Sequence, residues 1–422
     1  MRIVMGAQSC GFGPVSKLTA ISRLLDHADR VFVGTTVAAD FAEQNADAYD
    51  HLIDEGASAA EIAREIERAD WVVSVMNVDL VFSALAAGTP VLLIDSLLAF
   101  WLVERDPAEI AEVVGRIRAA GFDDWRTTLS VLTPHEQVFA AHLAATASIA
   151  QNFPGVPERI EQLTALGAAR PTLSGAIVDE VGLALPQPEP DGLDLLVNIG
   201  GFKNFLLDYD THNEYVRLIS RWIPELVARH PQFRRVAVCG GAYSGSRGYT
   251  ELVGGGEVTF GCLPQREFMS ALASARAYLV TPGLTALHES IALGRFPLAL
   301  PEEHYGHITN LAGLSGTRFG ADGLRFDDLI DGYAVPADDF AGTAAIADHV
   351  GRLLVDEGAY RRFADRATTG IARYLGLSDQ QRQDGVRELR DRLLGPTFAE
   401  ALREAAPDLV AGAMSRPLVS RR

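Results

Sequence analysis

Short apolar runs alternate with amphipathic segments from the start of the chain. Residues 2–6 are apolar, a glycine loop follows, and apolar side chains then recur every three or four positions over residues 15–25. This change of period is typical of a strand, a turn and a helix. The pattern continues and predicts further strands at residues 30–34, 71–75, 91–94, 129–132 and 148–151. Because strands that alternate with helices form parallel sheets covered on both faces, the first half is predicted to be Rossmann-like.

The second half repeats this organisation after a proline-rich segment. Residues 185–192 read LPQPEPDG, a composition typical of a linker. Strands are predicted at residues 195–199, 235–239, 258–262, 278–280 and 296–300, with helices between them. We therefore predict an N-terminal domain at residues 1–185, a C-terminal domain at residues 193–395, and a C-terminal helix with a loosely ordered tail at residues 396–422.

Composition narrows the class of protein. The 422 residues suffice for two cores, and 48% hydrophobic with 22% charged residues is typical of a soluble globular protein. The net charge of −18 argues against nucleic acid or an anionic membrane as the main partner. Three scattered cysteines indicate a reducing, cytoplasmic location, and the chain opens on a strand-like run rather than a signal peptide. The most apolar window, residues 78–103, is broken by a Gly-Thr-Pro turn and Asp95, so no membrane span is expected.

Residues 277–314 carry the clearest candidate chemistry. They predict a strand, a Thr-Pro-Gly turn, a helix over 284–293, a second strand, and a polar loop at 302–310. Such a turn directs backbone N–H groups and the positive end of a helix towards one point, which suits a phosphate. The loop offers carboxylates and imidazoles that suit sugar hydroxyls. A nucleotide-sugar would satisfy both, although an ordinary βαβ unit with a solvated loop explains the same residues.

Three segments of the second half resemble the GT-B glycosyltransferases. They are NIGGFKN at 198–204, GCLPQREFMSALASARAYLVTPG at 261–283, and GLTALHESIALGRFPLALPEEHYGHITNLA at 283–312. The last is similar to the donor signature of the UDP-glycosyltransferases and of the lipid II-forming N-acetylglucosaminyltransferase. The resemblance implies an α/β GT-B fold, with two Rossmann-like domains facing a central cleft. The donor would bind in the C-terminal domain and the acceptor in the N-terminal one.

The resemblance and the glycine turns together give a predicted donor site. Backbone groups near residues 261–263 would contact the base, and a glutamate would hold the ribose. The two glycine turns and a lysine would hold the diphosphate. The polar loop would contact the sugar. The predicted donor residues are Gly200, Gly201, Lys203, Arg247, Cys262, Leu263, Gly283, Thr285, Glu289, Glu303, His304 and His307. His304 and His307 have no third ligand at metal spacing, so no metal is predicted.

The N-terminal half departs from the family pattern. Relatives usually carry a general-base histidine in the first glycine loop, where this chain has Gly13 followed by Pro14, and the Asp-Gln pair of the sugar loop is replaced by Gly306-His307. The candidate bases are Asp95, which follows an apolar strand, and His135. Asp95 can instead be the N-cap of a helix, and His135 can instead be a histidine of a surface loop. Because ligands bind at the carboxyl ends of parallel strands, the predicted acceptor residues are Ser9, Gly11, Phe12, Gly13, Ser96 and Gln151.

The predicted function is an inverting glycosyltransferase that uses a nucleotide-sugar, most simply a UDP-sugar, with no other cofactor. VLLIDSLLAFW and QNFPG are similar to a cytosylglucuronate synthase-like subgroup of antibiotic pathways. That similarity implies transfer of glucuronic acid to cytosine or a related small acceptor. Two alternatives stay open: a nucleotide-sugar 2-epimerase of the same fold, and a catalytically inactive binding subunit. A homodimer is compatible with the predicted enzyme and with both alternatives.

Overall fold

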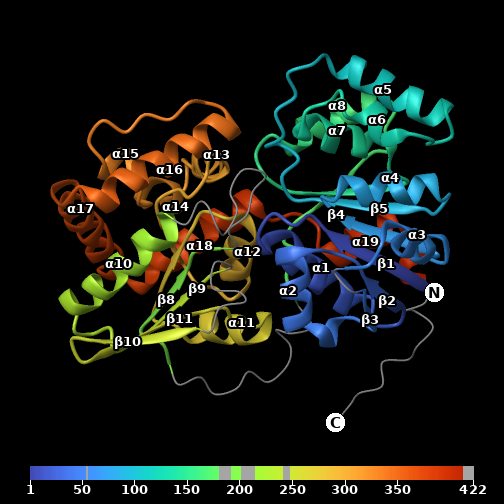
Figure 1. Cartoon of the computed structure of the whole chain (residues 1–422). Coiled ribbons are helices and arrows are strands. Elements are labelled where there is room, and N and C mark those ends of the chain that lie inside the picture. The colour runs from blue at the N-terminus through green and yellow to red at the C-terminus, as the bar shows by residue number, and fades with distance from the viewer. Residues whose placement is uncertain (54–55, 180–191, 201–213, 241–247, 412–422) are drawn as a thin grey trace, which may run out of the picture. The chain divides into compact units, whose positions relative to one another are not determined.

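The computed structural model describes residues 1–53, 56–179, 192–200, 214–240 and 248–411. The chain divides into two compact units, each with its own sheet (Figure 1). Unit 1 consists of Met1–Ser9, Pro14–Val181 and Leu393–Arg422, and unit 2 of Cys10–Gly13 and Gly182–Arg392. Of the predicted linker, only Gly192 is among the described residues.

The sheet of unit 1 has seven strands in the order β3-β2-β1-β4-β5-β6-β7, and every neighbouring pair is parallel. Its central strands are buried on both faces, which explains their nearly continuous apolar sequences. The strands are β1 (Arg2–Ala7), β2 (Asp29–Phe32), β3 (His51–Leu52), β4 (Trp71–Val75), β5 (Val91–Asp95), β6 (Ala147–Gln151) and β7 (Thr172–Ser174).

Helices connect these strands, and side-chain caps fix where several of them begin. Capping boxes start α3 at Ser58 and α7 at Thr133, in each case with a glutamate three residues later. The helices in this part of the chain are α1 (Phe12–Leu24), α2 (Thr36–Gln44), α3 (Ala59–Glu67), α4 (Val78–Ala86), α5 (Pro107–Ala119), α6 (Trp125–Leu129), α7 (Pro134–Ala144) and α8 (Val156–Ala165), with a 3₁₀ turn, η1 (Ala46–Ala48).

The C-terminal helices α19 (Phe398–Ala405) and α20 (Pro407–Ala411) also belong to unit 1. Helix α19 packs against β6 and β7. The Gly175 N–H donates to the Pro396 carbonyl at 2.7 Å, and the Asn152 amide donates to the Leu394 carbonyl at 2.9 Å. Helices α19 and α20 therefore complete the core of the first sheet.

The sheet of unit 2 has six strands in the order β10-β11-β9-β8-β12-β13. Only β10 runs antiparallel, against β11. The strands are β8 (Leu195–Asn198), β9 (Arg235–Cys239), β10 (Tyr249–Val253), β11 (Gly256–Gly261), β12 (Ala277–Val280) and β13 (Leu298–Ala299). The helices are α10 (Glu214–Arg229), α11 (Gln265–Ser274), α12 (Leu284–Ala292), α13 (Tyr305–Gly313), α14 (Arg318–Asp322), α15 (Phe326–Leu329), α16 (Asp339–Val355), α17 (Glu357–Leu375) and α18 (Asp379–Leu393).

The predicted fold class, an α/β protein with two Rossmann-like sheets, is confirmed. The strand predicted at residues 129–132 is wrong, because this segment is the end of α6 and a turn. Leu129 and Leu132 are buried while Val131 is 56% exposed. Buried positions three residues apart form one side of a helical turn, and so short a run does not distinguish the two structures.

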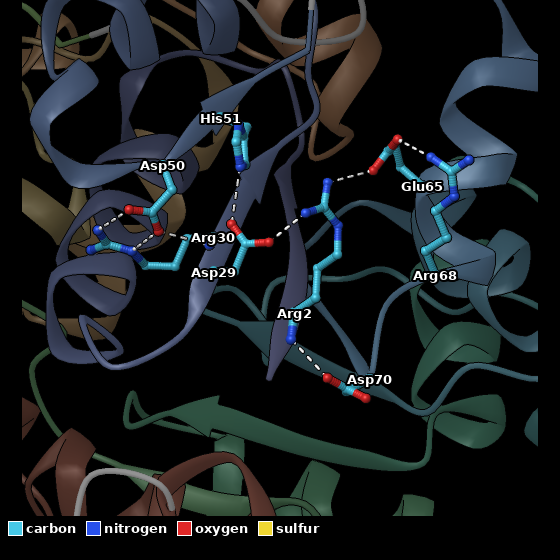
Figure 2. Close-up of polar contacts among 8 residues, drawn as sticks. All are labelled: Arg2, Asp29, Arg30, Asp50, His51, Glu65, Arg68 and Asp70. Carbon is cyan, nitrogen blue, oxygen red and sulfur yellow. Dashed lines mark hydrogen bonds and ion pairs between the residues drawn. The ribbon is translucent and has the colours of Figure 1, made fainter. Parts of the chain in front are cut away.

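A chain of ion pairs joins the amino-terminal ends of the first strands (Figure 2). Arg2 binds Asp29 and Glu65, Glu65 also binds Arg68 at 3.2 Å, and Asp29 also binds His51 at 3.1 Å. Beside it, Arg30 binds Asp50 at 2.9 Å. These charges lie at the edge opposite the carboxyl ends where ligands bind in parallel sheets. We therefore interpret this network as structural.

Within the described part of the chain, no helix is both long and apolar enough to cross a membrane.

Candidate functional site

The strand order of unit 2 reverses between β8 and β12. From β8 the chain continues to β9 on one side, whereas β12 pairs with β8 on the other side. In open parallel sheets, the carboxyl ends at such a switch point flank the ligand crevice. Here they lead into Gly200 and the Thr281–Gly283 turn, which are joined through a hydrogen bond from Thr281 N to Asn198 O at 2.9 Å. The sheet thus brings two of the predicted phosphate turns together.

The turn after β8 requires glycine. Gly200 has φ of +72°, and its N–H donates to Asn198 Oδ1 at 2.8 Å. A Cβ at this position would lie 3.2 Å from Thr281 Oγ1, on the neighbouring turn. Both the left-handed backbone and the close approach therefore exclude larger residues. Gly201, Lys203 and Arg247 lie outside the described residues, so their donor roles stay predictions.

Helix α12 begins directly at the second turn. Gly283 is its N-cap residue, in an extended conformation, and no side chain caps the helix. The first N–H groups of an α-helix have no partner within the helix, and the helix dipole adds positive charge there. Thr285 is half-buried in this first turn. The N-terminus of α12 thus has backbone donors and a dipole that suit an anion, and anion binding at this segment stays a prediction.

A second helix N-terminus lies against the first. Asn310 of α13 donates its side-chain amide to the Pro282 carbonyl at 2.8 Å. A Cβ added to Gly283 would lie 4.0 Å from His307 Nε2, in ordinary contact. The N-cap residue of α13, His304, makes no side-chain cap, but Thr343 Oγ1 accepts from the Tyr305 N–H at 3.1 Å. The uncapped N-terminus of α12 therefore lies beside the first turns of α13 at the switch point.

The loop predicted at residues 302–310 ends at His304, because α13 begins at Tyr305. His304 and His307 form a pair of tilted rings at the start of this helix. Their ring centroids are 3.8 Å apart, and the Glu303 N–H donates to His307 Nδ1 at 3.2 Å. Nδ1 is therefore the acceptor, and the ring proton of neutral His307 is on Nε2, which faces Gly283. Burial lowers the pKa of His304 to about 4, and burial with the neighbouring His304 lowers the pKa of His307 well below its ordinary value. His307 is a fixed neutral donor at this turn.

The two glutamates of the loop are buried as well. Glu302 Oε2 accepts a hydrogen bond from the Phe326 N–H at 3.1 Å, which gives it a structural task. Glu303 Oε1 is buried and has no hydrogen-bond partner among the described residues. Burial raises the pKa of Glu303 well above its ordinary value. Burial therefore favours the uncharged form of this carboxyl group.

The predicted ribose and base contacts line the same edge of the sheet. Glu289 of α12 is buried, and together with burial its negative charge raises the pKa of Tyr278, which shows that the two side chains are close. Cys262 and Leu263 are half-buried between β11 and α11. Burial, with a smaller effect of Cys262, raises the pKa of Cys239 to about 12. Their contacts with a nucleotide stay predictions.

Three of the six predicted acceptor residues make side-chain hydrogen bonds within the chain. Ser9 donates to the Thr35 carbonyl at 2.7 Å, Ser96 to Met76 Sδ at 3.3 Å, and Gln151 to the Gly175 carbonyl at 3.3 Å. Gly11 is buried, with φ of +81°. Phe12 and Gly13 are half-buried and begin α1. The structure places these side chains at strand ends, and their roles towards an acceptor stay predictions.

The predicted base Asp95 is fully buried in unit 1. One carboxylate oxygen accepts from the Leu97 N–H at 2.7 Å, and the other accepts from Trp101 Nε1 at 2.6 Å and contacts His142 Nε2 at 3.0 Å. A general base has to contact the acceptor, and Asp95 has no exposed surface. Its geometry is that of a support for the loop after β5. The role as a base stays a prediction.

The other predicted base, His135, is buried in the first turn of α7 and is not a surface-loop residue. Its Nδ1 accepts from the Leu102 N–H at 3.2 Å, and its ring stands edge-on to Trp101 with the centroids 5.2 Å apart. Asp95 and His135 therefore hold the same loop from two sides. The partner His142 was missed from the sequence because a single histidine within an apolar helix carries no spacing signal.

No group of three or more histidine, cysteine or acidic side chains suited to a metal ion occurs among the described residues.

Comparisons with known proteins give structural matches only. No family model matches the chain, and no curated protein matches its sequence. The glycosyltransferase of kitacinnamycin matches with a TM-score of 0.46 and 15% identity, covering 93% of this chain and 99% of its own. SnogD, a glycosyltransferase from Streptomyces nogalater, matches with a TM-score of 0.44 and 14% identity, covering 97% and 99%. Phytolacca americana UGT2, complexed with UDP-2-fluoro-glucose and pterostilbene, matches with a TM-score of 0.44 and 13% identity, covering 92% and 98%.

Proposed function

We propose that the protein is a glycosyltransferase that moves a sugar from a nucleoside diphosphate, in the first place a UDP-sugar, to a small acceptor. One observation carries the proposal. The N-terminus of α12, whose N-cap residue Gly283 has no capping side chain, lies at the switch point of the second sheet, beside the glycine turn at Gly200 and in contact with His307 and Asn310 of α13. The first backbone N–H groups of such a helix, with the positive end of its dipole, suit a phosphate of a diphosphate.

The chemistry follows from this placement. The N–H groups would stabilise the negative charge that grows on the diphosphate as it leaves. The Nε2–H of His307 and the carboxyl group of Glu303, whose uncharged form burial favours, would bind sugar hydroxyls. Attack by a deprotonated acceptor oxygen or nitrogen in a single displacement would invert the anomeric centre. The acceptor would be bound by the first half of the chain, as the resemblance implies.

The finer assignment, glucuronic acid transferred to cytosine, rests on the subgroup resemblance. A uronate carries a negative charge, whereas the polar loop supplies two glutamates and two neutral histidines. Lys203 is predicted to hold the diphosphate, so Arg247 is the predicted donor residue that would have to neutralise the uronate. Loss of turnover with UDP-glucuronate but not with UDP-glucose in Arg247→Ala would support this assignment.

The test is turnover. The purified protein is incubated with UDP-glucose or UDP-glucuronate, with and without cytosine, and released UDP and the product anomer are measured. The proposal predicts UDP release that depends on the acceptor, with an inverted product. Conversion of the donor without an acceptor would identify an epimerase. Binding of UDP without turnover across a broad acceptor panel would identify an inactive binding subunit.

A further inference from the structure

A hollow lies in unit 2 at the amino-terminal side of β13. Its volume is about 520 Å³, counted with its open mouth, and the residues that matter here are Phe296, Leu298, Arg318, Phe319, Arg373 and Tyr374. The loop with Glu303 and His307 follows the other end of the same strand. The hollow and the candidate donor site therefore occupy opposite edges of the sheet.

The floor of the hollow is aromatic and rigid. Phe296 and Phe319 are buried. The Tyr374 hydroxyl donates to the Phe296 carbonyl at 2.8 Å, and the two rings lie 6.4 Å apart at an angle of 39°. A planar ring of a ligand would meet fixed aromatic surfaces here, and such contacts stabilise aromatic pairs beyond simple burial.

Two guanidinium groups border this floor. Arg318 forms a 3.4 Å ion pair with Asp322, while its Nε is buried and has no hydrogen-bond partner among the described residues. Arg373 is exposed, and no ion pair to it occurs within the described ranges. The lining therefore holds two cations and one anion, Asp322. A second anion would balance the charge of this lining, and the exposed guanidinium of Arg373 could donate to it.

The carboxyl end of α17 borders the hollow, and a cation offsets the negative charge of its helix dipole. Arg382 donates to the carbonyls of Tyr374 at 2.7 Å and Leu375 at 3.4 Å. Its guanidinium also lies 4.5 Å from the centre of the Tyr374 ring. A cation at the end of a helix offsets the negative pole of the dipole. The aromatic floor is thus flanked by positive charge.

We propose that this hollow binds a small aromatic anion, a carboxylate or sulfonate on one or two fused rings. The rings would lie on Phe296, Phe319 and Tyr374, and the anionic group would lie between Arg318 and Arg373. The site does not depend on the proposed glycosyl transfer.

The test is isothermal titration of the full chain with 1-naphthoate and with its neutral counterpart 1-naphthalenemethanol. The acid should bind at least about tenfold more tightly, the value of one charge-assisted hydrogen bond. Arg373→Ala should weaken naphthoate about tenfold. Arg362→Ala, on the same helix but paired with Asp331 at 3.3 Å, should leave binding unchanged.

Leu377→Trp supplies a second variant, because it fills the hollow and keeps both arginines. It should abolish naphthoate binding. The proposal is overturned if naphthoate does not bind, if the alcohol binds equally well, if Arg373→Ala and Leu377→Trp have no effect, or if saturating UDP displaces naphthoate. The last result would place the ligand in the candidate donor site.

Discussion

At the scale of residues, burial decides what the candidate groups can do. The sequence suggested Asp95 and His135 as bases, and the structure uses both to hold the loop after β5. At the start of α13, by contrast, burial raises the pKa of Glu303 and lowers the pKa of His307, which favours the uncharged form of both beside a glycine turn. Burial thus produces structural supports in one unit and hydrogen-bonding groups with shifted pKa values in the other.

Asp95→Asn should act through stability. An amide cannot accept from Leu97, Trp101 and His142 as the carboxylate does, so the free energy of unfolding should fall by about 3 kcal/mol. Urea denaturation measures this loss, with the exposed Asp26→Asn as control. If Asp95 is the general base, Asp95→Asn should instead keep its stability and lose turnover.

Glu303→Gln should change how stability depends on pH. Burial raises the pKa of Glu303 in the folded state. Such an acid contributes stability below its unfolded pKa of about 4.3, and this contribution is lost as pH rises through the folded pKa. Glutamine is neutral throughout, so the variant should equal the wild type near pH 4 and be more stable at about pH 8. Chemical denaturation at both pH values checks this, with the exposed Glu404→Gln as control. Equal stability of Glu303→Gln and wild type at both pH values would contradict the burial argument.

At the scale of elements, the two helices α12 and α13 define the site. Their segments were recognisable from the sequence because helical spacing follows a Thr-Pro-Gly turn and because the polar loop is local. The tie from Asn310 to Pro282 and the orientation of His307 were not predictable, since both depend on contacts between elements. For the same reason the partners of Asp95 could not be predicted, while the alternation of strands and helices could.

Gly283→Val should separate binding from folding. The new Cβ would meet its nearest atoms at 3.9 and 4.0 Å, which is ordinary contact. We expect a stability change of no more than about 1 kcal/mol, the scale of an N-cap substitution. The side chain would, however, fill the space before the N–H groups of α12. Titration with UDP should show lost binding, whereas Gly115→Val, at an open position on α5, should bind normally.

At the scale of the whole molecule, the chain forms two sheets and returns to the first one at its end. Truncation after residue 395 removes α19 and α20 from unit 1. Leu402 and Leu409 are fully buried there, and each contributes roughly 2 kcal/mol. The shortened chain should therefore lose stability in unit 1 and keep UDP binding in unit 2. Hydrogen exchange resolved by segment would show this, and uniform loss of protection across both units would contradict it.

The central claim is that unit 2 binds a nucleoside diphosphate at the N-termini of α12 and α13. Isothermal titration with UDP, repeated on Gly283→Val, tests it most directly. We predict one UDP per chain, with a gain of about 2.7 kcal/mol in unfolding free energy at a hundred times the dissociation constant. Binding should be lost in Gly283→Val at nearly unchanged stability. Absence of binding by UDP and by the other nucleoside diphosphates, or UDP binding that Gly283→Val leaves intact, would contradict the claim.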